Sequence, residues 1–351
     1  MFIAPSEISQ IHLELTEKCN AACPICLRTE SRGLHPKPYI GKQELTLPDI
    51  KRFFTPTIRD QLQEVHMCGS YGDPIMARDC LEIARYFSTE KCEVSISTNG
   101  SARGVKWWAE LGRVLCKSRN SRVDFHIDGL ADTNSFYRRN THFDKIIDNA
   151  RAYIHSGGRA NWEFIPFKHN EHQLEEARKL SISLGFHRFT VKKSNWMFSK
   201  GKTKIPFSTA SGKQYYLEAP SDSQRPKPLK DRPQDVFSGP ATKSIQCLAR
   251  QNKEIYVSCE GIVYPCCWTA RYGRDIYLDR KTVDGFSTLF KQHDGRRHFN
   301  IRTHSLEQIL QSDFFAQLAK KWKNREPAVC YRKCWKRDQA EKIKIDNRQT
   351  I

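Results

Sequence analysis

The chain has 351 residues and carries 58 Lys or Arg against 39 Asp or Glu, which gives a formal net charge of +19. Its hydrophobic fraction of 38%, with 19 Phe and 7 Trp, is typical of a folded protein and excludes a disordered tail. No stretch approaches the roughly 18 apolar residues of a membrane span, and the N-terminus lacks a signal-peptide pattern. We therefore expect a cytoplasmic protein without membrane contact, whose basic excess favours polyanionic partners.

Strand and helix patterns alternate through the first part of the chain. Strands are expected at Ile11–Leu15, Glu64–Cys68, Glu93–Thr98, Val123–Ile127, Asn161–Phe167 and His187–Val191. Helices are expected at Leu47–Gln61, Asp79–Thr89, Gly104–Lys117, Phe143–Ser156 and Glu171–Leu184. Six strands that alternate with helices predict an α/β fold with a parallel sheet, which would curl into a partial (β/α)6 barrel.

The alternation stops in the last part of the chain. Residues 199–243 are rich in Pro, Ser and Lys, which predicts a linker or surface excursion. Beyond it, Glu254–Ser258 and Ile262–Tyr264 predict a hairpin with Gly261 in its turn. A helix is expected near Ser305–Lys323.

Three cysteines follow the first expected strand. Cys19, Cys23 and Cys26 have C-x-x-x-C-x-x-C spacing, and clustered cysteines in a reducing compartment indicate metal ligands before disulfides. Three thiolates can hold a [4Fe–4S] cluster at three irons and leave the fourth iron open. The end of a parallel strand is also where α/β folds build active sites. The alternatives are a zinc site completed by His35, or buried thiols without a metal.

This loop resembles that of the radical S-adenosylmethionine (SAM) enzymes, whose open iron binds the amino and carboxylate groups of SAM. The run Gly69-Ser70-Tyr71-Gly72-Asp73-Pro74 follows the second strand and resembles the family's Gly-Gly-Glu-Pro motif, whose backbone receives the SAM ammonium group. Tyr71 and Asp73 depart from that motif. The resemblance thus implies a SAM-binding role for Gly69, Tyr71, Gly72, Asp73 and Pro74.

Two further motifs end the third and fourth strands. Ser97 and Asn99, in Ser97-Thr98-Asn99-Gly100, are polar groups that can hydrogen-bond a ribose. His126 and Asp128 lie where the family has Ser-Ile-Asp-Gly, with His126 in place of Ser. The family's arginine corresponds to Arg138, with Arg139 as competitor, and its guanidinium fork suits the SAM carboxylate.

The resemblance implies the chemistry as well as the fold. A reduced cluster would donate one electron to SAM, and cleavage of the carbon–sulfur bond would give a 5′-deoxyadenosyl radical that abstracts hydrogen from a substrate. The reaction requires an external one-electron donor. No side chain can be named as a catalytic acid or base.

A second cysteine set lies near the C-terminus. Cys247 and Cys266 flank the expected hairpin, and Cys330 and Cys334 follow the last helix, which resembles SPASM or twitch domains with auxiliary iron–sulfur clusters. One auxiliary [4Fe–4S] cluster on these four ligands is expected, and zinc is the alternative. The remaining cysteines are interpreted as spare ligands or as small core residues: Cys259 and Cys267, and Cys68, Cys80, Cys92 and Cys116.

The expected organisation is a radical SAM barrel at residues 1–198, the excursion at 199–243 and a SPASM- or twitch-like domain at 244–351. A nucleic acid or nucleotide-like polyanion is the favoured substrate. It is indicated by the net charge and by aromatic residues among the C-terminal basic ones, namely Trp268, Tyr272, Trp322 and Trp335. A peptide or protein side chain is the alternative that the resemblance implies. A non-catalytic zinc-binding adaptor for nucleic acid is a remote third.

Overall fold

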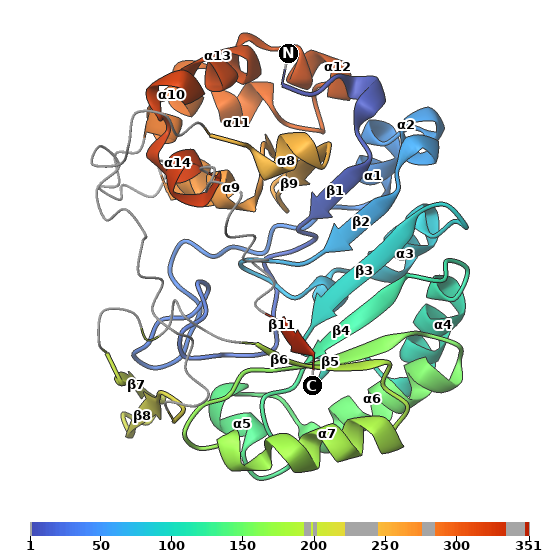
Figure 1. Ribbon diagram of the computed structural model, residues 1–351, viewed down its shortest axis with the longest axis vertical. Coiled ribbons are helices and arrows are strands. Elements are labelled where there is room, and N and C mark those ends of the chain that lie inside the picture. The colour runs from blue at the N-terminus through green and yellow to red at the C-terminus, as the bar shows by residue number, and fades with distance from the viewer. Residues whose placement is uncertain are drawn as a thin grey trace, which may run out of the picture. The chain divides into compact units, whose positions relative to one another are not determined.

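The computed structural model describes residues 2–192, 198, 202–221, 245–275, 285–334 and 348–350. The chain forms two compact units, each assembled from separate stretches of sequence (Figure 1). Unit 1 comprises Met1–Glu14, Leu45–His66 and Leu229–Ile343. Unit 2 comprises Leu15–Glu44, Met67–Pro228 and Lys344–Ile351. The domain boundaries expected at residues 198 and 243 stay a prediction.

Unit 2 is built on a sheet covered by helices. Its parallel strands are β3 (Glu93–Thr98), β4 (Arg122–His126), β5 (Ala160–Phe164) and β6 (Arg188–Lys192), and β11 (Arg348–Thr350) pairs antiparallel to β6. Figure 1 shows α3, α4, α6 and α7 following one another along this sheet. The helices and 3-10 turns of unit 2 are η2 (Pro74–Met76), α3 (Cys80–Phe87), α4 (Val105–Leu115), α5 (Asn134–Tyr137), α6 (Phe143–His155), η3 (Glu171–Gln173) and α7 (Leu174–Ser183).

The strands of unit 2 are almost continuously buried, as expected for a parallel sheet under helices. All five residues of β5 are buried, and the largest side chains of the core are aromatic. The ring centres of Trp108 in α4 and Phe125 in β4 lie 5.1 Å apart, and both side chains are fully buried. This packing fixes the carboxyl ends of the strands, where the predicted site residues lie.

Unit 1 contains β1 (Gln10–Leu13), most of β2 (Glu64–Met67), β9 (Glu254–Val257) and β10 (Val263–Tyr264). β9 pairs parallel to β1 and antiparallel to β10, which confirms the expected hairpin. Its helical elements are η1 (Pro5–Glu7), α1 (Leu47–Phe53), α2 (Pro56–Gln61), α8 (Leu248–Gln251), α9 (Cys267–Asp275), α10 (Gly285–Gln292), α11 (Gly295–His298), α12 (Leu306–Leu310), α13 (Asp313–Lys321), η6 (Trp322–Asn324) and α14 (Ala328–Cys334).

Two expected helices are each interrupted. The pattern at 47–61 is two helices, because Pro56 starts α2 and disfavours a helical backbone at Thr55. The pattern at 305–323 is likewise divided into α12 and α13, and Ser312 immediately precedes α13. Thr46 caps α1, with its side chain accepting a hydrogen bond from the backbone of Asp49, as its position before the helix predicts.

The excursion at 199–243 contains a hairpin that the sequence did not predict. Its strands are β7 (Lys204–Ser208) and β8 (Gln214–Glu218), which pair antiparallel within unit 2. The Gly33 amide donates to the Ser208 carbonyl over 2.9 Å, and the Ser208 amide donates to Ser31 over 2.9 Å. Phe207 and Leu217 are buried in one cluster with Cys23. The excursion therefore returns onto the cysteine loop.

Candidate functional site

Cys19, Cys23 and Cys26, the first cysteine site, lie on one tight loop of unit 2. The Cys26 amide donates to the Cys23 carbonyl over 3.1 Å, and the Ala22 amide donates to the Arg139 carbonyl over 3.0 Å. Cys23 is buried, whereas Cys19 and Cys26 are half-buried. Burial and then the charge of Asp73 raise the pKa of Cys19, and the charges of Cys23 and Cys26 add to this. The neighbouring thiols therefore add to the effect of burial and disfavour the ionised form of Cys19.

This donor set fits an iron–sulfur cluster. Burial raises the pKa of Cys23 to about 11, Arg138 opposes the shift and Cys26 adds to it. Buried thiols of this kind ionise when a metal supplies positive charge, because a coordinating thiol is deprotonated outright. Three thiolates on one loop match the ligation of a [4Fe–4S] cluster at three of its irons.

The glycine-rich loop packs backbone to backbone against the start of the cysteine loop. A Cβ at Gly72 would lie 1.8 Å from the carbonyl oxygen of Thr16, so no other residue fits there without displacement. The Asp73 amide donates to the Lys18 carbonyl over 2.9 Å. Of the other predicted residues in this loop, Tyr71 and Pro74 are buried and Gly69 is half-buried.

Asp73 and Asn99 form a buried polar contact beside Cys19. Asp73 Oδ2 accepts from the Asn99 amide over 2.8 Å and from Asn99 Nδ2 over 2.6 Å. Burial raises the pKa of Asp73, and the hydrogen bond from the Asn99 backbone opposes the shift. Asn99 Nδ2 also lies 3.9 Å from Cys19 Sγ and 3.0 Å from Asn20 Oδ1. Ser97, also predicted, is half-buried on β3.

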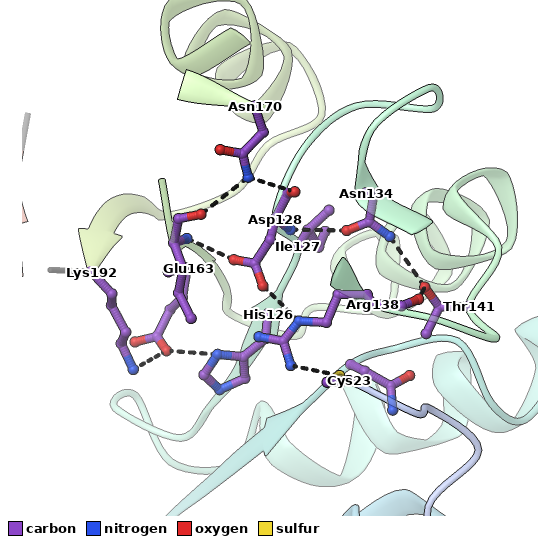
Figure 2. A network of polar contacts seen from close by, with 12 residues as sticks. Cys23, His126, Ile127, Asp128, Asn134, Arg138, Thr141, Glu163, Asn170 and Lys192 are labelled. Carbon is purple, nitrogen blue, oxygen red and sulfur yellow. Dashed lines mark hydrogen bonds and ion pairs between the residues drawn. The ribbon is translucent and has the colours of Figure 1, made fainter. Parts of the chain in front are cut away.

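Arg138 joins the end of β4 to the cysteine loop (Figure 2). Its Nε donates to Asp128 Oδ2 over 2.6 Å, and its Nη1 lies 3.9 Å from Cys23 Sγ. Burial alone would lower the pKa of Arg138, but the charges of Asp128 and Cys23 raise it well above the ordinary value. A permanent positive charge therefore stands beside Cys23, one of the three predicted cluster ligands.

Asp128 holds this arginine in place from the core. Its Oδ1 accepts from the Ile165 amide over 2.6 Å, and its backbone carbonyl accepts from Asn170 Nδ2 over 2.9 Å. Its own amide donates to Asn134 Oδ1 over 2.9 Å, as Figure 2 shows. Asp128 thus connects β4, α5 and the segment after β5, and it is fully buried.

His126 belongs to a second polar group that the sequence did not predict. Its Nδ1 lies 3.3 Å from Glu163 Oε2, and Lys192 Nζ also contacts that carboxylate (Figure 2). Burial and then the charges of Lys192 and Arg138 lower the pKa of His126 well below its usual range. His126 is therefore neutral at pH 7.

Arg139 lies in an aromatic box that the sequence also did not predict. Its guanidinium carbon is 4.9 Å from the ring centre of Tyr215, 5.6 Å from that of Phe207 and 5.7 Å from that of Phe136. Its Nε and Nη2 are buried without a hydrogen-bond partner among the described residues. Cation–π contact of this kind fixes the β7–β8 hairpin to α5. The only sequence signal was the doublet Arg138-Arg139.

The second cysteine site, in unit 1, brings together four thiols from three segments. Cys247 precedes α8, Cys266 precedes α9, and Cys330 and Cys334 lie one turn apart on α14. Burial raises the pKa of Cys247 to about 12, and the charges of Cys266 and Cys334 add to this. Burial and then Cys266, Cys247 and Cys334 raise the pKa of Cys330 well above its ordinary value. Four thiols that raise one another's pKa in this way suit the ligation of a metal or cluster.

The other cysteines are placed differently. Cys259 and Cys267 lie near buried Tyr256. The pKa of Tyr256 is raised by burial, then by the charge of Glu14 and, to a smaller extent, by the charges of these two thiols. Cys80 and Cys92 are buried and Cys68 is half-buried. Cys116 is exposed, so its assignment to the core was wrong. It follows the last residue of α4, where the helix end reaches solvent.

The predicted base-stacking residues divide into two kinds. Trp268 of α9 is 49% exposed, and Lys333 Nζ lies 3.5 Å from its ring centre. Arg332 Nη2 donates to the Tyr272 hydroxyl over 3.1 Å. Trp322 is only 8% exposed, and its ring centre lies 6.0 Å from that of Phe2. Its assignment to a stacking surface was therefore wrong. Trp335 lies outside the described residues.

Comparison with known families decides what these sites belong to. The model of the radical SAM superfamily matches residues 13–180, and that of an iron–sulfur cluster-binding domain, SPASM, matches residues 247–335. The chain belongs to the radical SAM superfamily. Membership implies a [4Fe–4S] cluster and SAM in the first region and auxiliary iron–sulfur ligation in the second, as the sequence predicted.

Relatives of this radical SAM protein match it over less than half of their length. A probable GTP 3′,8-cyclase of Thermococcus kodakarensis is 28% identical over 139 residues, which is 40% of each chain. The mycofactocin maturase MftC of Mycolicibacterium smegmatis is 26% identical over 174 residues, 49% of this chain and 41% of its own.

A solved structure supports the fold. Streptococcus suis SuiB bound to S-adenosylmethionine aligns with a TM-score of 0.50 at 15% identity, over 81% of this chain and 68% of SuiB. The expected α/β fold, a partial (β/α)6 barrel with a small C-terminal cluster-binding domain, is confirmed. None of the helices in the described ranges has the length and apolar character that a bilayer span requires.

Proposed function

We propose that this protein is an enzyme that cleaves SAM reductively and abstracts hydrogen from a nucleic acid or a nucleotide-like polyanion. When bound, the cluster and SAM supply one-electron cleavage and a hydrogen-abstracting radical. The first cysteine site holds the cluster, and the second holds an auxiliary cluster. The chain's own residues bind, orient and electrostatically balance these groups.

The predicted SAM-binding residues of the first three strand ends receive the following roles. Gly72 lets the glycine-rich loop approach the cysteine loop closely. The family resemblance assigns the SAM ammonium group to the backbone of Gly69, Tyr71 and Pro74. Asp73 orients Asn99 beside Cys19. The side chains of Ser97 and Asn99 form hydrogen bonds with the ribose of SAM at the end of β3.

The positive charge for the SAM carboxylate comes from Arg138. Asp128 binds Nε of this guanidinium and thereby orients its remaining nitrogens. His126, held by Glu163, stays neutral and keeps a polar, uncharged group at the end of β4. Arg139 is unsuited to the carboxylate, because three aromatic rings surround its guanidinium.

The proposed substrate class is supported by the surface formed by α9 and α14. Exposed Trp268 under Lys333, next to Tyr272 and Arg332, combines a stacking platform with phosphate-binding charge. α14 also carries Cys330 and Cys334 of the second cysteine site, and Cys266 immediately precedes α9. The similarity to GTP 3′,8-cyclases agrees with a nucleotide-type substrate.

Binding of tRNA, DNA and an acidic peptide across a salt series tests the substrate class. Polyanion binding should weaken steeply with salt, and Trp268→Ala with Lys333→Glu should reduce it at least about tenfold at low salt. Lys291→Glu on α10, an exposed residue outside this surface, is the matched control. Equal binding by the double variant and wild type would refute the polyanion proposal.

Two other functions are outcomes of the same work. Preferential binding of the acidic peptide, with no effect of Trp268→Ala, would favour the peptide side chain that the family resemblance implies. Iron and sulfide analysis after anaerobic reconstitution tests the enzyme itself. Stoichiometric zinc without iron, and no 5′-deoxyadenosine on reduction, would favour a zinc-binding nucleic-acid adaptor.

A further inference from the structure

Unit 2 has a basic hollow that the SAM-binding roles leave unused. The cavity measures about 580 Å³, and all the charged residues that line it are basic. These side chains come from the cysteine loop, from the segments that follow η2 and β3, and from the start of α6. They are Lys18, Arg78, Arg103 and Lys145, together with His142.

The hollow keeps a net positive charge after its ion pairs are counted. Lys18 pairs with Glu44 over 2.9 Å, and Arg78 pairs with Asp79 over 2.9 Å. Arg103 donates instead to the carbonyls of Ile75 and Ala77, over 2.7 and 2.6 Å, and so retains its charge. Lys145 is exposed on the first turn of α6 and has no carboxylate within ion-pair distance among the described residues. Two uncompensated cations thus face the cavity.

The hollow also lies against the first cysteine site. Asn20 lines it and follows Cys19 directly in the chain. Asn99 Nδ2 donates to Asn20 Oδ1 over 3.0 Å and lies 3.9 Å from Cys19 Sγ. Asn20 therefore belongs both to the lining of the hollow and to the polar contacts around Cys19.

We propose that this hollow docks an acidic one-electron carrier protein that reduces the cluster at Cys19, Cys23 and Cys26. The inference rests on the proposed function, which consumes one electron for each SAM cleaved. The carrier is oxidised by one electron and the cluster is reduced by one. Complementary charge would orient the carrier and speed its encounter, and the lining residue Asn20 would bring it beside the cysteine loop.

The make-up of the hollow favours a carrier protein over a nucleotide. Among the described residues, its lining includes no Trp, Tyr or Phe on which a base could stack, whereas the surface at α9 and α14 has Trp268 and Tyr272. Lys145, which is exposed at the hollow, suits the carboxylates of an acidic protein surface.

The test reverses charge at the hollow without touching the cysteine or SAM-binding residues. Arg78→Glu with Lys145→Glu is compared with Lys179→Glu, an exposed lysine on α7 that does not line the cavity. The probe is a purified FMN-loaded flavodoxin of net negative charge, titrated calorimetrically at low and high salt. We expect the double variant to bind at least about tenfold more weakly at low salt, with a smaller difference at high salt because salt screens the attraction.

A second readout separates docking from chemistry. SAM cleavage driven by limiting reduced flavodoxin should fall in the double variant, whereas cleavage driven by dithionite should equal that of wild type. Unchanged flavodoxin affinity, or an equal loss in Lys179→Glu, overturns the proposal. Loss of tripolyphosphate or tRNA binding with flavodoxin binding intact would make the hollow a substrate site. If wild type fails to cleave SAM with dithionite, the proposed function fails, and the calorimetry still decides the docking.

Discussion

The first cysteine site is one short loop with three thiols, whereas the second joins four thiols from three segments that the chain brings together only on folding. The surroundings also differ. The first site is flanked by Arg138, Asp73 and Asn99. At the second site, the charges that raise the pKa of Cys247 and Cys330 are those of the other thiols of the site. Charged and amide neighbours suit a site that must also bind a polar ligand. A closed set of thiols suits a site whose metal is held by protein alone.

The largest effect should come from the close backbone approach beside the first site. Gly72→Ala would place its Cβ against the Thr16 carbonyl, which should cost about 2–3 kcal/mol and displace the cysteine loop. We expect loss of 5′-deoxyadenosine formation and of the iron bound by Cys19, Cys23 and Cys26. Gly104→Ala is the control, because a Cβ there would meet nothing within 4 Å. Normal activity in Gly72→Ala would mean that the two loops do not pack in this way.

Iron content distinguishes the two sites next. We expect about eight irons after anaerobic reconstitution, and replacing Cys19, Cys23 and Cys26 by Ala should remove about half. Cys330→Ala with Cys334→Ala should remove the other half and loosen unit 1, because the metal there connects distant segments. Substrate-free SAM cleavage should survive that second change. Stoichiometric zinc with about four irons would contradict the prediction of an auxiliary cluster but would agree with the cluster at the first site.

These two experiments concern features that the sequence indicated to different degrees. The spacing of Cys19, Cys23 and Cys26 and the motifs ending at Asn99 and Asp128 are local, so their positions at strand ends could be predicted. The contact of Arg138 with Cys23 joins residues 115 positions apart, which no local spacing encodes. The polyanion-binding side chains were only partly predictable, because composition does not show that Trp322 is buried.

The β7–β8 hairpin was missed for a related reason. Its strands are short and lie among Pro, Ser and Lys, so the composition of 199–243 concealed them. What stabilises the hairpin is the packing of Phe207 and Leu217 on the cysteine loop and the cation–π contact of Arg139. The residues that cover a cluster loop can thus lie in a segment without any motif.

The adjacent arginines offer a finer test of the first site. Arg138→Ala should weaken SAM binding by about 1.5–3 kcal/mol, because it removes a charge-assisted hydrogen bond. Arg139→Ala should leave SAM affinity unchanged and instead release the hairpin, making the turn at residues 209–213 sensitive to protease. Equilibrium SAM binding and limited proteolysis of both variants provide the measurement. A SAM defect in Arg139→Ala alone would reverse the two roles.

The smallest expected effect is a pH dependence confined to the unit that holds the second site. Burial and then the charge of Glu64 raise the pKa of Glu254 in β9 from 4.5 to about 7. Because the folded state binds this proton more tightly than the unfolded state, the stabilisation is fully present below pH 4.5 and is lost as pH rises through about 7. We expect the free energy of unfolding to change by about 1–2 kcal/mol over this window after solvent screening.

Thermal unfolding of the metal-free protein across this pH range provides the measurement. Glu254→Gln should remove the pH-dependent loss of stability, and Glu175→Gln on α7 of unit 2 should leave it intact. An unchanged pH profile in Glu254→Gln would mean that the titration belongs to another group.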